Sequence, residues 1–93
     1  MLFMTTYTFR DDISHESVKE MLAVIASREP SPAEIAHYVA TDGSGGVVIS
    51  DVDAESLPAV YEGILQIQPW LEMHTRPVLA VDDAMTTVMK VYG

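Results

Sequence analysis

The chain contains no cysteine. This absence excludes a disulfide framework, a zinc site built from thiolates and a thiol nucleophile. Basic side chains are also scarce, with five Lys and Arg against 14 Asp and Glu, for a net charge of −9. Binding to phosphates needs a basic face, so the composition excludes nucleic acid and an anionic membrane surface as partners.

Long apolar runs are missing as well. No low-charge segment reaches the length needed to span a membrane. The apolar opening, residues 1–4, is too short for a signal peptide and no basic segment precedes it. We therefore expect a cytoplasmic protein. Its 93 residues, of which 48% are hydrophobic, predict one domain over residues 1–93.

The first half of the chain predicts a strand, a helix and a hairpin. Residues 2–9 are rich in β-branched and aromatic side chains with no charge on either face, which indicates a central strand covered on both sides. Ser14 is expected to cap a helix that Pro30 and Pro32 end. The apolar stripe of that helix is Val18, Met21, Leu22 and Ile25. Two short strands, residues 35–41 and 47–49, flank the glycine-rich turn over 42–46, which matches no phosphate-binding motif.

The second half predicts a helix, a strand and a terminal helix. Asp53 or Ser56 caps the second helix, whose expected buried stripe is Leu57, Val60, Tyr61, Ile64 and Leu65. Residues 70–81 read as a strand, and Pro77 places it at a sheet edge because proline cannot donate to a ladder. Asp82 or Asp83 is expected to cap the last helix, with an apolar stripe of Met85, Val88, Met89 and Tyr92.

This order of elements is the β-α-β-β-α-β unit of the ferredoxin-like α+β fold, followed by a short helix. Right-handed crossovers place the first and third strands in the centre and both main helices on one face of the sheet. The other face would then expose a sizeable apolar patch, which monomers rarely tolerate. We therefore expect a homodimer in which two sheets pack face to face, with the last helix docking on its own subunit or on the partner.

Five segments carry a resemblance that covers nearly the whole chain. They are MLFMTTYTF, PSPAEI, DGSGG, SDVDAESL and WLEMHTRPVLAVDDA. Through them the chain resembles the dimeric α/β-barrel superfamily, and within it a family of short bacterial domains of unknown function. That family carries an Arg-Trp-His run in its second strand, where this chain has His37, Tyr38 and Val39, so a role for the family's histidine does not transfer. The superfamily implies a choice among cofactor-free monooxygenases, polyketide cyclases, muconolactone-type isomerases, haem-degrading enzymes and simple binders.

The candidate site residues are histidines and aromatics on the predicted strands. His74 shares a strand face with Glu72 and Arg76, so Glu72 could raise the pKa of the imidazole and Arg76 could bind an anionic group. The competing interpretation is a polar strand edge facing water. His37 is either a hydrogen-bonded packing residue or a pocket residue. Tyr7, Tyr38 and Trp70 would form an aromatic pocket for a planar ligand or belong to the core.

The sequence leaves two functions open. In the first, a homodimer binds an apolar or aromatic small molecule, and an enzyme of this kind would be a cofactor-free monooxygenase, cyclase or isomerase. His74 or His37 would then be the acid/base, and Tyr7 or Tyr38 would donate a hydrogen bond to an enolate. In the second, the protein is a dimerisation or regulatory module with no ligand cavity. We expect no metal and no cofactor, with haem as a weaker third option.

Overall fold

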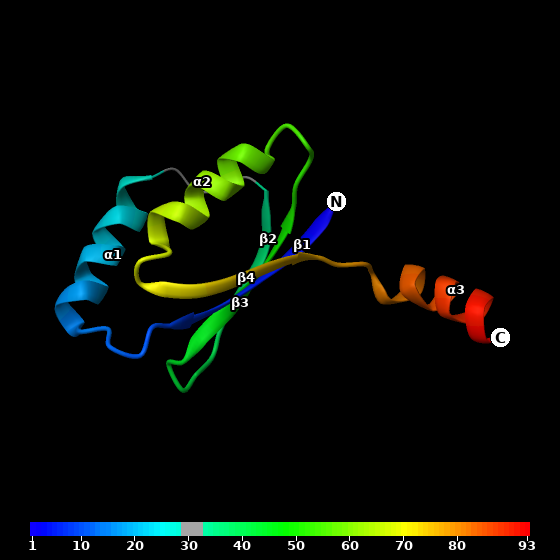
Figure 1. Cartoon of the computed structure of the whole chain (residues 1–93), viewed down its shortest axis with the longest axis horizontal. Helices are drawn as coiled ribbons and strands as arrows, with labels where there is room; N and C mark the ends of the chain where they lie inside the picture. The colour runs from blue at the N-terminus through cyan, green and yellow to red at the C-terminus, as the bar shows by residue number, and fades with distance from the viewer. Residues whose placement is uncertain (29–32) are drawn as a thin grey trace.

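The computed structural model describes residues 1–28 and 33–93, and Figure 1 shows how their elements are arranged. The predicted helix stop at Pro30 and Pro32 lies outside the described residues. The elements, in chain order, are β1 (Leu2–Phe9), α1 (His15–Ser27), β2 (Glu34–Val39), β3 (Gly45–Asp51), α2 (Leu57–Ile67), β4 (Leu71–Pro77) and α3 (Val81–Tyr92).

The four strands form one antiparallel sheet in the order β2-β3-β1-β4. The predicted α+β class, the two central strands and the edge position of the strand that contains Pro77 are thus confirmed. This order, with α1 and α2 as the two connections, is compatible with a ferredoxin-like fold. Helix α1 connects β1 to β2 across β3, and α2 connects β3 to β4 across β1. The two crossovers therefore leave β1 and β3 as neighbours in the centre of the sheet.

The strand register assigns every sheet residue to one of two faces. Tyr7 pairs with Met73 on one side and with Gly46 on the other, and Gly46 pairs with Val39. Tyr7 and Met73 pack against the buried core residues Met21 of α1 and Ile67 of α2, so this is the helix face. The alternate residues form the open face, which contains Leu2, Met4, Thr6, Ala36, Tyr38, Val47, Ile49, Glu72, His74 and Arg76.

The core lies at one end of the helix face. Met21, Ile67 and Leu71 are its buried members, and Tyr7, Phe9, Val18, Trp70 and Met73 pack against them. The predicted stripe of α2 is wrong in part. Val60 and Ile64 are half-buried, whereas Leu57, Tyr61 and Leu65 are exposed, because the helix turns its Val60–Ile64–Ile67 edge toward the sheet.

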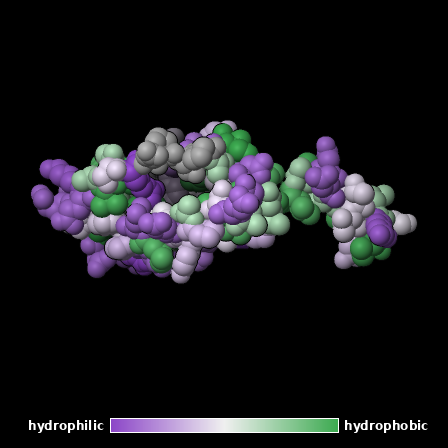
Figure 2. Space-filling model, turned by 90° about the horizontal axis from the view of Figure 1, so that it is seen from above, coloured by the Kyte–Doolittle hydropathy of each residue, from purple (hydrophilic) through white to green (hydrophobic). Residues whose placement is uncertain are grey.

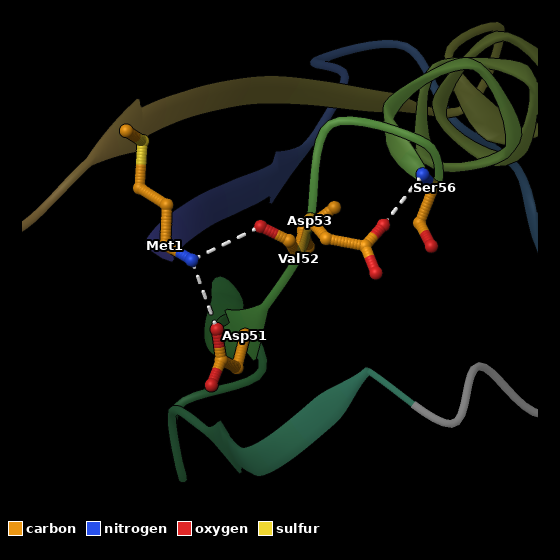
Figure 3. Close-up of polar contacts among 5 residues, drawn as sticks. All are labelled: Met1, Asp51, Val52, Asp53 and Ser56. Carbon is orange, nitrogen blue, oxygen red and sulfur yellow. Dashed lines mark hydrogen bonds and ion pairs between the residues drawn. The ribbon is translucent and has the colours of Figure 1, made fainter.

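The helix starts show which capping predictions hold. Ser14 caps α1 as predicted, because its hydroxyl accepts a hydrogen bond from the backbone N–H of Ser17 at 3.1 Å. At α2, Ser56 occupies the N-cap position without a side-chain bond, and Asp53 instead accepts from the Ser56 N–H at 2.9 Å (Figure 3). Beside them the Met1 ammonium donates to the Asp51 carboxylate and to the Val52 carbonyl. At α3, Ala80 is the N-cap and neither Asp82 nor Asp83 caps the helix.

Helix α3 stands clear of the rest of the molecule. Figure 1 shows it beyond the end of β4, and in Figure 2 it forms a separate lobe that carries hydrophobic surface. None of its residues is buried. The predicted docking of this helix on its own subunit is therefore absent from the described part of the chain.

Within residues 1–28 and 33–93, no helix is both long enough and apolar enough to cross a bilayer.

Candidate functional site

A hydrogen bond joins a central strand to an edge strand on the helix face. The Tyr7 hydroxyl of β1 lies 2.6 Å from Nε2 of His37 on β2, and the two rings meet edge to face with centroids 5.6 Å apart. Strand β3 runs between them, and Gly46 is the residue that the Tyr7 ring passes over. A Cβ on Gly46 would collide with the Tyr7 hydroxyl and lie 2.6 Å from the Tyr38 carbonyl oxygen. The missing side chain of Gly46 therefore lets the two groups meet.

A carboxylate lies beside the other nitrogen of the same imidazole. Oε1 of Glu34 is 3.6 Å from Nδ1 of His37. Two residues three apart on a regular strand point to opposite faces. Here the register shifts between Glu34 and Ala36, so that Glu34 pairs with Ser50 and His37 pairs with Val48. This β-bulge at Ile35 turns Glu34 onto the helix face with His37.

The surroundings of the pair are polar, unlike the other end of the helix face. The Thr5 and Thr75 hydroxyls hydrogen-bond at 2.8 Å across β1 and β4. Thr5 pairs with Val48, which in turn pairs with His37, so these side chains lie in one row of the helix face. Hydroxyl and imidazole groups thus gather on this face of the sheet, next to the apolar core. We call the residues Thr5, Tyr7, Glu34, His37, Ser50 and Thr75 the polar end of the helix face.

The electrostatics of this end keep the phenol protonated. Partial burial of Tyr7, and after it the negative charge of Glu34, raise the pKa of the phenol above its ordinary value of 10.0. Tyr7 is therefore a hydrogen-bond donor rather than a phenolate. The side chains of His37 and Glu34 remain 41% and 44% exposed, which leaves the imidazole accessible to a ligand.

The structure divides the predicted site residues between two faces. Tyr7 and His37 lie on the helix face, whereas Tyr38, Glu72, His74 and Arg76 lie on the open face. His37 and His74 are also on opposite edge strands, so one chain does not bring them together. Trp70 was expected beside Glu72 on a strand; it instead precedes β4 and packs against the core on the helix side.

On the open face, His74 and Glu72 form a second imidazole–carboxylate contact. Nε2 of His74 lies 3.4 Å from Oε1 of Glu72, and both side chains are more than 60% exposed. A shallow hollow of about 420 Å³ lies on this face beside Tyr38, between Thr6, Thr8 and Val47. A second hollow of about 550 Å³ lies at the end of β1, between Arg10, Asp11, Asp12 and Glu72. Both are open depressions.

Sequence reasoning missed Glu34 and Gly46. Glu34 escaped because strict alternation assigns it to the face opposite His37, and nothing in the sequence marks Ile35 as a bulge. Gly46 is predicted only as part of the glycine-rich turn. Its role becomes visible only when the register of β1, β3 and β2 is known. Within the described residues, no three His, Asp or Glu side chains gather closely enough to hold a metal ion.

Residues 1–92 match the model of a domain of unknown function, DUF3303. A search among curated proteins finds no match. The family match extends over almost every residue, including all seven elements, and the small α+β domain agrees with it. The chain therefore belongs to the DUF3303 family of domains of unknown function.

Proposed function

We propose that this protein binds an apolar or aromatic small molecule at the polar end of its helix face and transfers a proton to or from it without a cofactor. The observation that carries the proposal is the 2.6 Å contact between the Tyr7 hydroxyl and Nε2 of His37. A donor and a base that touch in the free protein can act on neighbouring atoms of one ligand. Isomerisation and cyclisation of an enolisable ketone need this pair of groups.

The proton transfer uses both atoms of that contact. The step starts from the His37 tautomer that keeps a lone pair on Nε2, to which Tyr7 donates its hydrogen. When a ketone binds, the phenol O–H turns to the ketone oxygen and frees the Nε2 lone pair. His37 then takes the proton from the carbon beside the carbonyl, and the electron pair of that C–H bond forms the enolate, which Tyr7 stabilises. Return of the proton from the imidazolium to a carbon of the ligand completes an isomerisation.

Hydrogen–deuterium exchange of a simple aromatic ketone tests this function directly. The protein is incubated with 1-indanone in D2O, and loss of the proton signal beside the carbonyl is followed by NMR. We expect exchange faster than in buffer alone, a fall of about 100-fold or more in the protein-dependent rate for His37→Ala, and a fall of about 2- to 10-fold for Tyr7→Phe, which removes one hydrogen bond.

Matched controls come from the open face. Tyr38→Phe removes a hydroxyl and His74→Ala removes an imidazole, and neither lies on the helix face. Both variants are expected to exchange 1-indanone at the wild-type rate. Exchange no faster than in buffer, or an unchanged rate in His37→Ala, would reject the proposal and favour a non-catalytic dimerisation or regulatory module.

The proposed assembly is a homodimer of the dimeric α/β-barrel type. The open face carries half-buried apolar residues on both central strands, among them Leu2, Met4, Val47 and Ile49. Neither α1 nor α2 lies over this face. A second copy of the same chain offers an identical apolar face, and a two-fold axis lets each sheet cover the other. The polar end stays outside this interface because it lies on the opposite side of the sheet.

A further inference from the structure

We infer that Glu34 is a positioning residue that holds the hydrogen of His37 on Nδ1, so that Nε2 keeps the lone pair that faces Tyr7. The inference rests on the proposed function, because it explains how the imidazole is prepared to act as a base. Its starting point is geometric: the carboxylate and the phenol lie at opposite nitrogens of one ring, 3.6 Å from Nδ1 and 2.6 Å from Nε2.

For a neutral imidazole, the donor and acceptor inventory favours one arrangement at the two nitrogens. An ionised carboxylate can only accept, so the nitrogen that faces Glu34 is favoured as the N–H. In a neutral imidazole the other nitrogen then carries the lone pair, and the Tyr7 O–H donates to it. The opposite tautomer would place a lone pair against the negative charge of Glu34. At 3.6 Å, Glu34 acts through its charge rather than through a full hydrogen bond.

The backbone is built to allow this contact. Without the bulge at Ile35, a residue three positions before His37 would lie on the open face, where His37 is out of reach. One extra residue in an edge strand therefore places the carboxylate on the face of the base. The comparable pair on β4, Glu72 and His74, needs no bulge because its members are two residues apart. Among residues 1–28 and 33–93, no tyrosine hydroxyl hydrogen-bonds to His74.

The tautomer of His37 can be read by NMR without any ligand. Long-range proton–nitrogen correlation spectra at alkaline pH distinguish the two nitrogens, and the chain has only three histidines to assign. Because Tyr7 also favours an unprotonated Nε2, the test is made in the Tyr7→Phe background. We expect Tyr7→Phe to retain the Nδ1–H form as the major species. Adding Glu34→Ala should reverse the ratio toward Nε2–H, the form that a free histidine side chain prefers.

The matched control is Glu72→Ala in the same background, which removes a carboxylate beside His74 and should leave the His37 tautomer unchanged. An unchanged His37 ratio in the Tyr7→Phe/Glu34→Ala variant would overturn the role of Glu34. Failure of this inference is separable from failure of the proposed function, since the tautomer is measured without ligand and the exchange of 1-indanone is measured in wild type. Glu34 is exposed, so its replacement leaves the core intact.

Discussion

At the scale of single residues, Gly46 determines whether Tyr7 can reach His37. Tyr7 and His37 are two strands apart, and any side chain on β3 at this point would separate them. The backbone of Gly46 is close to Tyr7 on one side and to the Tyr38 carbonyl on the other, so a Cβ at this position would force both neighbours to move.

We predict that Gly46→Ala breaks the Tyr7–His37 hydrogen bond and destabilises the protein by about 1–3 kcal/mol, the usual cost of overpacking. The added methyl group meets both the Tyr7 side chain and the backbone carbonyl of Tyr38 on β2, so both must move. The free energy of unfolding, measured by denaturant titration, and the contact between the two rings, measured by NMR, check both parts.

Gly63→Ala in α2 is the matched control, because its Cβ would meet only Arg28 Nη1, at 3.4 Å, the end of a flexible side chain. Alanine is a better helix former than glycine, so this variant should be more stable by about 0.5–1 kcal/mol. An equally stable Gly46→Ala variant with the ring contact intact would contradict the role given to Gly46.

At the scale of the elements, regular patterns were predictable and local departures from them were not. β1 has the predicted bounds because its β-branched and aromatic run is uninterrupted up to Phe9. The order of the strands was predictable because the apolar stripes identified the two helices that connect them. The bulge at Ile35 breaks a period of two that the sequence otherwise supports. Glu34 was therefore not predicted on the face of His37, and the site that depends on Glu34 follows only from the register. Trp70 was predicted to lie in the strand over residues 70–81, but it precedes β4.

A pH-dependent hydrogen bond between Asp53 and Ser56 stabilises the start of α2. The Asp53 carboxylate accepts hydrogen bonds from Ser56, including one from its backbone N–H (Figure 3). These hydrogen bonds lower the pKa of the Asp53 carboxyl below its ordinary value of 3.8. A carboxyl with a lowered pKa in the folded state stabilises the fold above its unfolded pKa, and this contribution disappears as the pH falls through the folded pKa.

We therefore predict that Asp53→Asn lowers the melting temperature relative to wild type near neutral pH, and that the difference shrinks as the pH falls below about 4. Thermal unfolding followed by circular dichroism between neutral and acid pH measures it. Glu55→Gln removes a neighbouring charge without touching the cap and should show no such convergence. A difference between wild type and Asp53→Asn that stays constant down to acid pH would count against the capping role of Asp53.

At the scale of the whole molecule, two apolar surfaces have no cover within the part of one chain that the structure describes. One is the open face of the sheet, on which Tyr38 is 67% exposed, and the other is the stripe of α3 that includes Met85 and Met89. A helix of 12 residues is about 18 Å long, and alone it is too small for a stable interface, which buries about 800 Å² on each partner. The sheet face and the helix together would form one surface large enough for a second copy of the chain.

We predict that wild type is a dimer in light scattering and ultracentrifugation, and that a charge in either surface weakens it. Tyr38→Glu on the open face and Met85→Glu/Met89→Glu on α3 should each raise the dimer dissociation constant by about 10- to 100-fold, because each places an unpaired charge in an apolar interface. These residues are exposed in the single chain, so the monomer should keep its circular dichroism spectrum.

Thr87→Glu, on the opposite side of α3, should leave the dissociation constant unchanged. A monomeric wild type would overturn the dimer, whereas a wild-type dissociation constant in the α3 variant alone would restrict the interface to the sheet.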